Sequence, residues 1–200
     1  LTKTTSPDTG VTTSQYNLQT LTQTTVDAAG KTWTSRYDKL GRLLETRVGS
    51  VSRVYVWDTV RSGVLSSLTT QDGQTSYVYD ALARIKQVSH KPNNGTALSV
   101  GYSWAKDLLQ TKTYPSGMKI SYGYTNGQIS SLSYNGTPLL SNIALDPAGR
   151  IKGFNWVNGA STGRRYDLAG RPEVIRSGAY SKQLSYDPAS RITRITETEV

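Results

Sequence analysis

Aromatic and aliphatic residues alternate with polar residues in short runs along the whole chain. Tyr55 and Trp57 stand two positions apart, as do Ile120, Tyr122 and Tyr124. Because successive side chains of a strand point to opposite faces of a sheet, this period of two predicts β-strands with the large residues on one face. The runs have the length of ordinary strands, roughly five to eight residues. We expect no helix of credible length.

A short motif follows five of these runs, with Asp at its start and Arg four positions later. Asp146-Pro147-Ala148-Gly149 has the residues that a type I β-turn favours at its first, second and fourth positions. The Asp carboxylate can accept a hydrogen bond from the backbone two residues on, and Gly adopts the positive φ of the turn. The motif therefore predicts a strand, a tight turn and a second strand. Its residues are Tyr37, Asp38, Gly41, Arg42, Tyr79, Asp80, Arg84, Asp146, Gly149, Arg150, Tyr166, Asp167, Gly170, Arg171, Tyr186, Asp187 and Arg191.

The motif position recurs along the chain at spacings of 20 to 23 residues. Its anchors are Asn17, Asp38, Asp58, Asp80, Ser103, Thr125, Asp146, Asp167 and Asp187, of which Ser103 and Thr125 are the weakest. A Gly precedes each anchor by seven to ten residues, at positions 10, 30, 49, 73, 95, 117, 136, 159 and 178. Two turns per period leave two strands per period, and tight turns make those strands antiparallel neighbours. We therefore predict that residues 1–200 form a single array of about nine repeats with a period of about 21 residues, cut from a longer chain.

The predicted fold is all-β: tandem hairpins that form one long antiparallel sheet. After the motif, Ile85 and Val88 stand three apart, as do Ile192 and Ile195, which we interpret as a β-bulge beside the turn. About eighteen strands exceed the roughly ten that a twisted open sheet usually tolerates, so we expect the sheet to spiral. Unpaired strands at its two ends predict edge-to-edge self-association.

Composition narrows the possible functions. The chain has no Cys and a single His, His90, so neither a disulfide framework nor a Cys- or His-based metal cluster is expected, and no cofactor is predicted. No apolar run is long enough to span a membrane. The formal net charge of +9 raises the question of nucleic acid, but the motif Arg residues are spread evenly, so we expect no nucleic-acid binding.

The recurring Asp–Arg pair has a chemical and a structural interpretation. It could hold a carbohydrate or a phosphate, or the Asp could cap the turn while the Arg lies across it or along the aromatic residue of the next repeat. We favour the structural interpretation, because a catalytic group needs to occur only once. His90 lies in a loop-like stretch and is not expected to act as a base. We therefore predict no catalytic residues and no enzyme activity.

A second possible function is carbohydrate binding. The chain has 13 Tyr and 4 Trp but a single Phe, and exposed aromatic rings can stack on sugars. Trp104 and Trp156 are the candidate glycan contacts. Cross-strand packing between repeats is the ordinary explanation for such residues.

The motif Tyr-Asp-x-x-Gly-Arg-Leu/Ile at this period resembles the YD repeat of the RHS family, which includes bacterial RHS polymorphic toxins, the C component of Tc insecticidal toxins and the teneurins. The resemblance covers essentially the whole chain. It implies a β-strip that forms part of a hollow shell around a toxic effector domain, in a secreted or cell-surface bacterial protein. The implied partners are the rest of the parent chain and its effector, with a cell-surface glycan as the alternative. The family's self-cleavage segment and toxin domain are not visible in the sequence.

Overall fold

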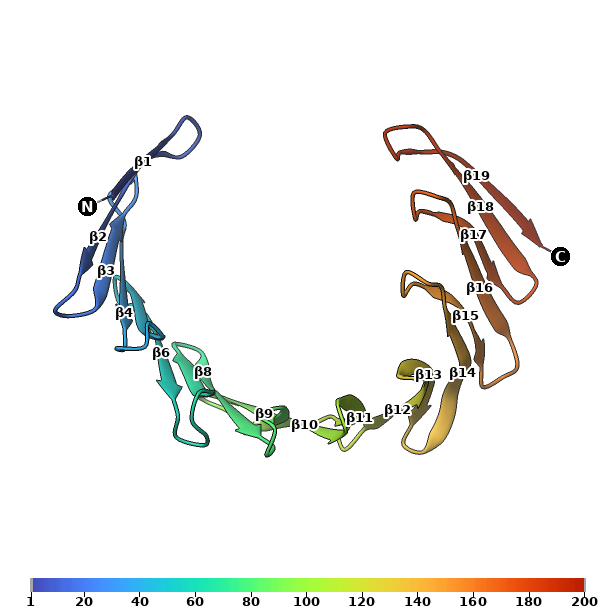
Figure 1. Ribbon diagram of the computed structural model, residues 1–200, viewed down its shortest axis with the longest axis horizontal. Coiled ribbons are helices and arrows are strands. Elements are labelled where there is room, and N and C mark those ends of the chain that lie inside the picture. Colours follow the sequence, from blue (N-terminus) through green and yellow to red (C-terminus); the bar gives the residue numbers. More distant parts are fainter. Residues whose placement is uncertain (1, 200) are drawn as a thin grey trace. The chain divides into compact units, whose positions relative to one another are not determined.

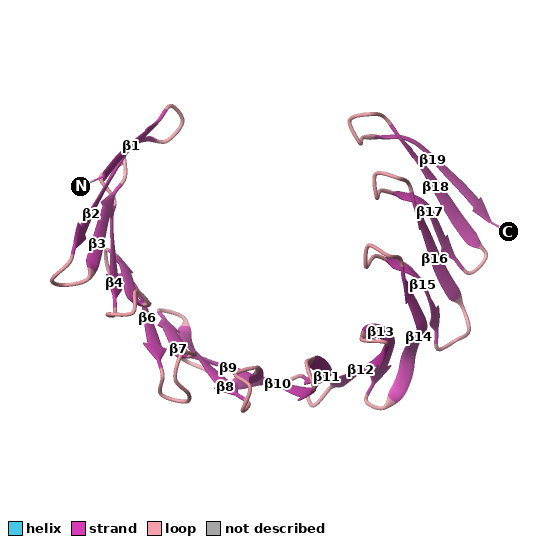
Figure 2. Cartoon of the chain, viewed as in Figure 1, coloured by secondary structure: helices cyan, strands magenta, loops and turns pink. Residues whose placement is uncertain are grey.

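The computed structural model describes residues 2–199 and contains nineteen β-strands joined by turns, with no helix in that range. The strands and turns are shown in Figures 1 and 2. The chain divides into two compact units, Leu1–Gly101 and Tyr102–Val200. The all-β prediction is confirmed, and none of the described residues forms a helix that could cross a membrane.

Strands of the first unit pair antiparallel with their neighbours in chain order, from β1–β2 to β9–β10. They are β1 (Thr2–Ser6), β2 (Gly10–Asn17), β3 (Thr22–Val26), β4 (Thr32–Tyr37), β5 (Leu43–Val48), β6 (Val51–Trp57), β7 (Leu65–Thr70), β8 (Gly73–Tyr79), β9 (Ile85–Pro92) and β10 (Leu98–Ala105), the last of which crosses into the second unit.

Strands of the second unit follow the same rule, from β11–β12 to β18–β19. They are β11 (Leu108–Thr113), β12 (Lys119–Thr125), β13 (Gln128–Tyr134), β14 (Thr137–Leu145), β15 (Ile151–Trp156), β16 (Ser161–Tyr166), β17 (Pro172–Ser177), β18 (Tyr180–Tyr186) and β19 (Ile192–Glu199).

Turns alternate between two edges within each unit. The Asp motifs form the turns of one edge, which we call the motif edge; it carries Asp38, Asp58 and Asp80 in the first unit and Asp146, Asp167 and Asp187 in the second. The predicted glycine turns form the other, the glycine edge. Eight of the nine predicted glycines have the positive φ that such turns require, and Gly95 does not. Two turns per repeat are therefore present, as the glycine spacing predicts.

One predicted anchor is placed wrongly. Ser103 lies inside β10, where its hydroxyl is 2.6 Å from that of Thr111, and the chain turns later, at residues 106–107. Thr125 is the last residue of β12, directly before the turn at 126–127. These two hairpins use two-residue turns in place of the five-residue motif, so their strands extend further before the chain reverses.

Bulges occur beside the motif turns, as the three-residue spacing predicts. Tyr79 pairs with Ile85, but Val78 pairs with Gln87, so Lys86 is an extra residue on β9. The same shift precedes Tyr186, which pairs with Ile192 while Ser185 pairs with Arg194. A bulge bends the strand and increases its twist.

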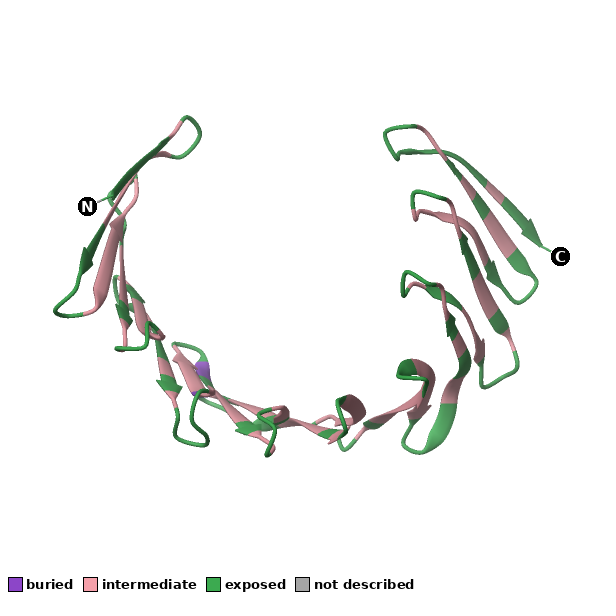
Figure 3. Cartoon of the chain, viewed as in Figure 1, coloured by how far each residue is buried: buried purple, intermediate pink, exposed green. Residues whose placement is uncertain are grey.

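The sheet has no hydrophobic core. Ser66 and Gly73 are the only residues buried in the described range, and every large apolar side chain there is half-buried or exposed, as Figure 3 shows. Stability therefore depends on ladder hydrogen bonds and on side-chain contacts between adjacent strands. In such an array each hairpin is held mainly by its immediate neighbours.

Candidate functional site: the motif edge

Each motif turn is closed by the backbone. In the first, the N–H of Asp38 donates to the carbonyl of Arg42 at 2.9 Å, and the N–H of Gly41 donates to the carbonyl of Asp38 at 3.0 Å. The turns that begin at Asp80, Asp146, Asp167 and Asp187 have the same pair of bonds. The fourth residue is in the left-handed region in all five turns, although two of them have Ala83 or Ser190 in place of Gly.

The Asp carboxylate caps this turn. Oδ1 of Asp38 accepts the N–H groups of Leu40 and Arg42, each at 2.9 Å. Oδ2 accepts Nε of Arg42 at 2.7 Å. The Nε bonds of Arg84, Arg150, Arg171 and Arg191 to the Asp of their own motif measure 2.6–2.7 Å.

These bonds lower the pKa of the carboxyl groups. For Asp146 the hydrogen bond from the Arg150 side chain is the largest influence, and the pKa lies below its usual value. The Arg84 side chain has the same effect on the pKa of Asp80. For Asp38, desolvation raises the pKa, but the hydrogen bonds from Arg42 and Leu40 outweigh it. Each carboxylate is therefore held ionised within its own turn.

The motif Arg also reaches the aromatic residue of the following repeat. The guanidinium carbon of Arg42 lies 5.2 Å from the ring centroid of Trp57. Arg150 lies 4.3 Å from the Tyr166 ring, and Arg171 lies 4.5 Å from the Tyr186 ring. Each of these Arg side chains therefore contacts two consecutive repeats.

The aromatic residue in turn donates a hydrogen bond to the repeat before it. Nε1 of Trp57 donates to the carbonyl of Leu43 at 2.9 Å, and the hydroxyl of Tyr166 donates to that of Ile151 at 2.9 Å. Each acceptor is the residue that directly follows a motif Arg, and it lies outside the ladder that joins the two hairpins. The aromatic side chain thus satisfies a carbonyl that the backbone ladder does not reach.

The turn at Asp58 is longer and links repeats differently. Arg42 donates to both carboxylate oxygens of Asp58, at 2.9 and 2.7 Å, while Gly63 donates its N–H to the same carboxylate at 2.6 Å. Arg61 in this loop donates to the carbonyls of Asp80 and Ala81 in the next turn. Ser66, the buried residue at the base of the loop, accepts the N–H of Thr59 at 2.9 Å.

The motif residues do not converge on a common centre. They occur in separate turns, and no group of three His, Cys, Asp or Glu side chains suited to a metal occurs among residues 2–199. The imidazole Nδ1 of His90 lies 3.0 Å from the hydroxyl of Thr75 in the neighbouring strand. The arrangement builds turns and joins repeats.

The two candidate glycan contacts lie apart. Trp104 is near the end of β10 that leads to the motif edge, whereas Trp156 ends β15 at the glycine edge. Trp156 is 40% exposed, packs edge-on against Phe154 and donates from Nε1 to the hydroxyl of Thr162 at 3.1 Å. They do not form a shared aromatic row.

The turn at Gly30 was predicted, but its motif-like Asp cap was not. Asp27 opens a turn on the glycine edge with the same bonds: its N–H donates to the carbonyl of Lys31, and its Oδ1 accepts the N–H groups of Ala29 and Lys31. The Asp-x-x-Gly spacing was visible in the sequence. It was missed because Val26 stands where an aromatic residue is expected and because the position lies out of phase with the period.

Comparison with known proteins identifies the fold. No protein-family profile and no curated protein matches the sequence. Among solved structures, the Tc toxin complex TcdB2-TccC3 matches with a TM-score of 0.79 and 17% identity. The same complex without its hypervariable C-terminal region matches with a TM-score of 0.78 and 18% identity. In both, the match covers 98% of this chain and 12% of the other. The chain thus has the fold of an RHS-type YD-repeat strip and spans about an eighth of the length of the matched chains.

Proposed function

We propose that this chain is a non-catalytic structural segment in the wall of an RHS or Tc-type toxin shell that encloses an effector domain. The observation that carries the proposal is the paired linkage between repeats: Arg171 stacks on Tyr186, and Tyr186 donates to the carbonyl of Pro172. The motif side chains serve the continuity of the sheet. The likeness in fold to the Tc toxin structures supports the same conclusion.

The role follows from the hydrogen-bonded backbone. Every strand in the two units is paired with a neighbour in chain order. The aromatic side chains donate hydrogen bonds to the backbone carbonyls beside the bulges. A continuous sheet of this kind would separate an enclosed polypeptide from proteases and from the producing cell. Such a shell would belong to a secreted or cell-surface bacterial protein, with the rest of the parent chain as its partner.

The test is limited proteolysis of the complete protein encoded by the reading frame that contains this segment. We expect the segment and a further enclosed part to resist cleavage together and to become sensitive together on mild denaturation. The matched control is the enclosed part expressed alone, which should be cleaved rapidly. Equal cleavage rates for the enclosed part in both settings would contradict an enclosing role.

The adhesion alternative is supported by the exposure of Trp156. It predicts saturable binding to a neutral cell-surface glycan that is lost on Trp156→Ala. Because Trp104 lies toward the other edge, Trp104→Ala should weaken binding only if a second site exists. A glycan array that shows no binding would contradict the adhesion alternative.

A further inference from the structure

Four asparagines of the chain directly precede a glycine, and this pair of residues is especially open to spontaneous deamidation. They are Asn94, Asn126, Asn135 and Asn158. In deamidation the backbone nitrogen of the following residue attacks the side-chain amide carbon of the Asn. Glycine favours this attack because it has no Cβ to hinder the approach and leaves the backbone free to rotate. All four pairs lie in turns between strands, so the fold around each pair decides whether it can react.

Two of the four pairs are held in two-residue turns. Asn126 and Asn135 have φ of 52° and 46°, and the residues on either side of each turn are paired in the ladder. The Oδ1 atom of Asn135 also accepts the N–H of Lys119 at 2.7 Å. Because the flanking pairs fix the backbone, the glycine nitrogen cannot swing toward the side-chain carbon unless the end of the hairpin opens.

The turn at Asn158 engages both reacting groups. The attacking nitrogen, that of Gly159, donates its hydrogen to the carbonyl of Trp156 at 3.0 Å. The amide under attack, that of Asn158, accepts the N–H of Ala160 through its Oδ1 at 3.1 Å. Both hydrogen bonds must open before the nitrogen and the carbon can meet.

The loop around Asn94 holds its pair far more weakly. Residues 93–97 join β9 to β10, and each of them is exposed. The N–H of Gly95 donates to the carbonyl of Pro92 at 3.4 Å, which exceeds the usual range of about 2.7–3.2 Å. Neither Asn94 nor Gly95 has a positive φ. Within residues 2–199, the side chain of Asn94 has no hydrogen-bond partner.

We propose that Asn94 is a site of spontaneous deamidation in the folded chain. The nitrogen of Gly95 attacks Cγ of Asn94 and forms a C–N bond, while the side-chain nitrogen leaves as ammonia with the proton that Gly95 has lost. The product is a five-membered succinimide ring. Water then opens the ring, giving aspartate when it adds at Cγ and isoaspartate when it adds at the main-chain carbonyl carbon. The exchange of nitrogen for oxygen needs no oxidant, metal or cofactor, and it adds one negative charge at neutral pH.

The reaction changes a loop that is anchored on the turn between β7 and β8. Asn93 donates its N–H to the carbonyl of Asp72 at 3.2 Å and its side-chain Nδ2 to the carbonyl of Gln71 at 2.5 Å. Isoaspartate lengthens the main chain by one methylene group directly after this anchor, and the new carboxylate has the same charge as Asp72. The ladder pair that closes the loop, Leu98 with His90, is therefore expected to open more readily, which amide exchange measures.

The test follows the four pairs by peptide mapping and mass spectrometry while the full chain stands in a mildly alkaline buffer. Deamidation is seen as the mass change when oxygen replaces NH, and an isoaspartyl methyltransferase detects the isoaspartate product. We expect Asn94 to react at least about fivefold faster than the other three asparagines, since opening even one turn hydrogen bond slows the attack by roughly that factor. The rate should rise with pH, because the attacking nitrogen must lose its proton.

The matched control is the same chain unfolded in urea, where the four pairs lose their turns and should react at similar rates. Asn94→Gln keeps the side-chain amide but requires a six-membered ring, which closes far more slowly, so it should abolish the early mass change. The proposal would be overturned by equal rates at the four pairs in the folded chain, by an earlier reaction at another pair, or by no reaction at Asn94. An early mass change that persists in Asn94→Gln, or the same ranking in urea, would overturn it as well.

Discussion

The hydroxyl of Tyr186 donates a 2.7 Å hydrogen bond to the carbonyl oxygen of Pro172, which belongs to the preceding repeat. The ladder between β17 and β18 begins at the pair Val174 and Gln183, so it leaves the Pro172 carbonyl without a backbone partner on β18. The side chain takes the place of a missing ladder bond. The same relationship joins Tyr79 to Leu65 and Tyr124 to Leu109, each at 2.8 Å.

Tyr186→Phe removes this hydrogen bond and keeps the ring that stacks on Arg171. We expect a loss of about 1 kcal/mol in the free energy of unfolding, the usual net contribution of one hydrogen bond. Urea denaturation followed by tryptophan fluorescence measures it. Tyr134→Phe, at a position that is 44% exposed, is the matched control and should change stability much less. Equal losses in the two variants would show that the hydroxyl of Tyr186 contributes nothing specific.

Ala83→Gly should stabilise the protein. Ala83 has φ of 63° in the turn after Asp80, where the other motif turns mostly have Gly. The left-handed conformation costs a non-glycine residue about 1–2 kcal/mol, and Gly relieves it, partly offset by greater freedom in the unfolded chain. Ala148→Gly is the control, since Ala148 has no positive φ and should lose stability. A loss on Ala83→Gly, measured by thermal unfolding, would contradict the argument.

Gly149→Val should damage one turn and leave distant repeats intact. Gly149 has φ of +78°, which a β-branched residue adopts at a cost of at least about 1–2 kcal/mol. Because contacts in the array are mostly between neighbours, amide exchange should accelerate in β14 and β15 and stay unchanged in β18 and β19. Exchange that accelerates evenly over the whole chain would mean that the units unfold as one.

Stability should fall in acid because the motif carboxylates must be ionised to cap their turns. The hydrogen bond from Arg150 lowers the folded-state pKa of Asp146 below its unfolded value of about 3.9. Its contribution is therefore complete above about pH 4–5 and is lost as the pH falls through the folded pKa. Urea titrations at pH 7, 4 and 3 should show a smaller acid loss in Asp146→Asn than in the unmodified chain. Asp8→Asn, outside the motif, is the control, and an identical pH profile for both variants would contradict this role.

Local turn chemistry made much of the fold predictable. The Asp-x-x-Gly-Arg signature fixes a turn within five residues, and the period of two fixes the strands on either side, so Asp146 and Gly149 could be assigned from the sequence alone. The bulge was visible in the spacing of Ile192 and Ile195. Ser103 was misplaced because its hairpin uses a two-residue turn without the motif.

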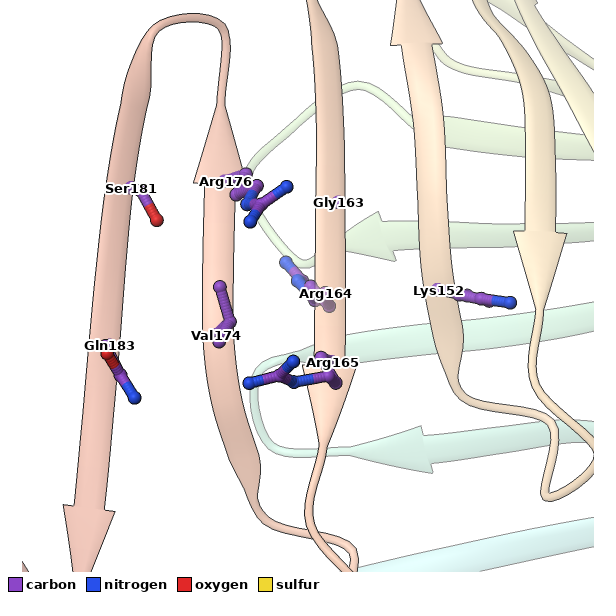
Figure 4. Close-up of a pocket in the computed structure, with 8 residues that line it drawn as sticks. All are labelled: Lys152, Gly163, Arg164, Arg165, Val174, Arg176, Ser181 and Gln183. Carbon is purple, nitrogen blue, oxygen red and sulfur yellow. The ribbon is translucent and has the colours of Figure 1, made fainter. Parts of the chain in front are cut away.

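Contacts between repeats were less predictable. The sequence suggested that the motif Arg lies along the next aromatic ring, but nothing in it pointed to the carbonyls of Leu43 or Pro172 as hydrogen-bond acceptors. These carbonyls accept from a side chain because the hydrogen-bond ladder to the next strand ends before it reaches them. Where a ladder ends depends on the register of three adjacent strands. Arg176 and Ser181 likewise come together only through the pairing of β17 with β18 (Figure 4).

Arg42 and Arg191 occupy the same motif position but have different surroundings. Arg42 bonds to Asp38, bonds to both oxygens of Asp58 and lies over the Trp57 ring. Arg191 bonds to Asp187 and has an 81% exposed side chain.

Lys cannot reproduce the planar fork that two acceptors and a ring require. Arg42→Lys should therefore lower the midpoint of urea unfolding clearly more than Arg191→Lys does, and 0.5 M NaCl should narrow the difference only partly, since the Arg42 side chain is 22% exposed. Equal effects of the two substitutions would mean that the Arg acts only within its own turn and that the links between repeats do not stabilise the array.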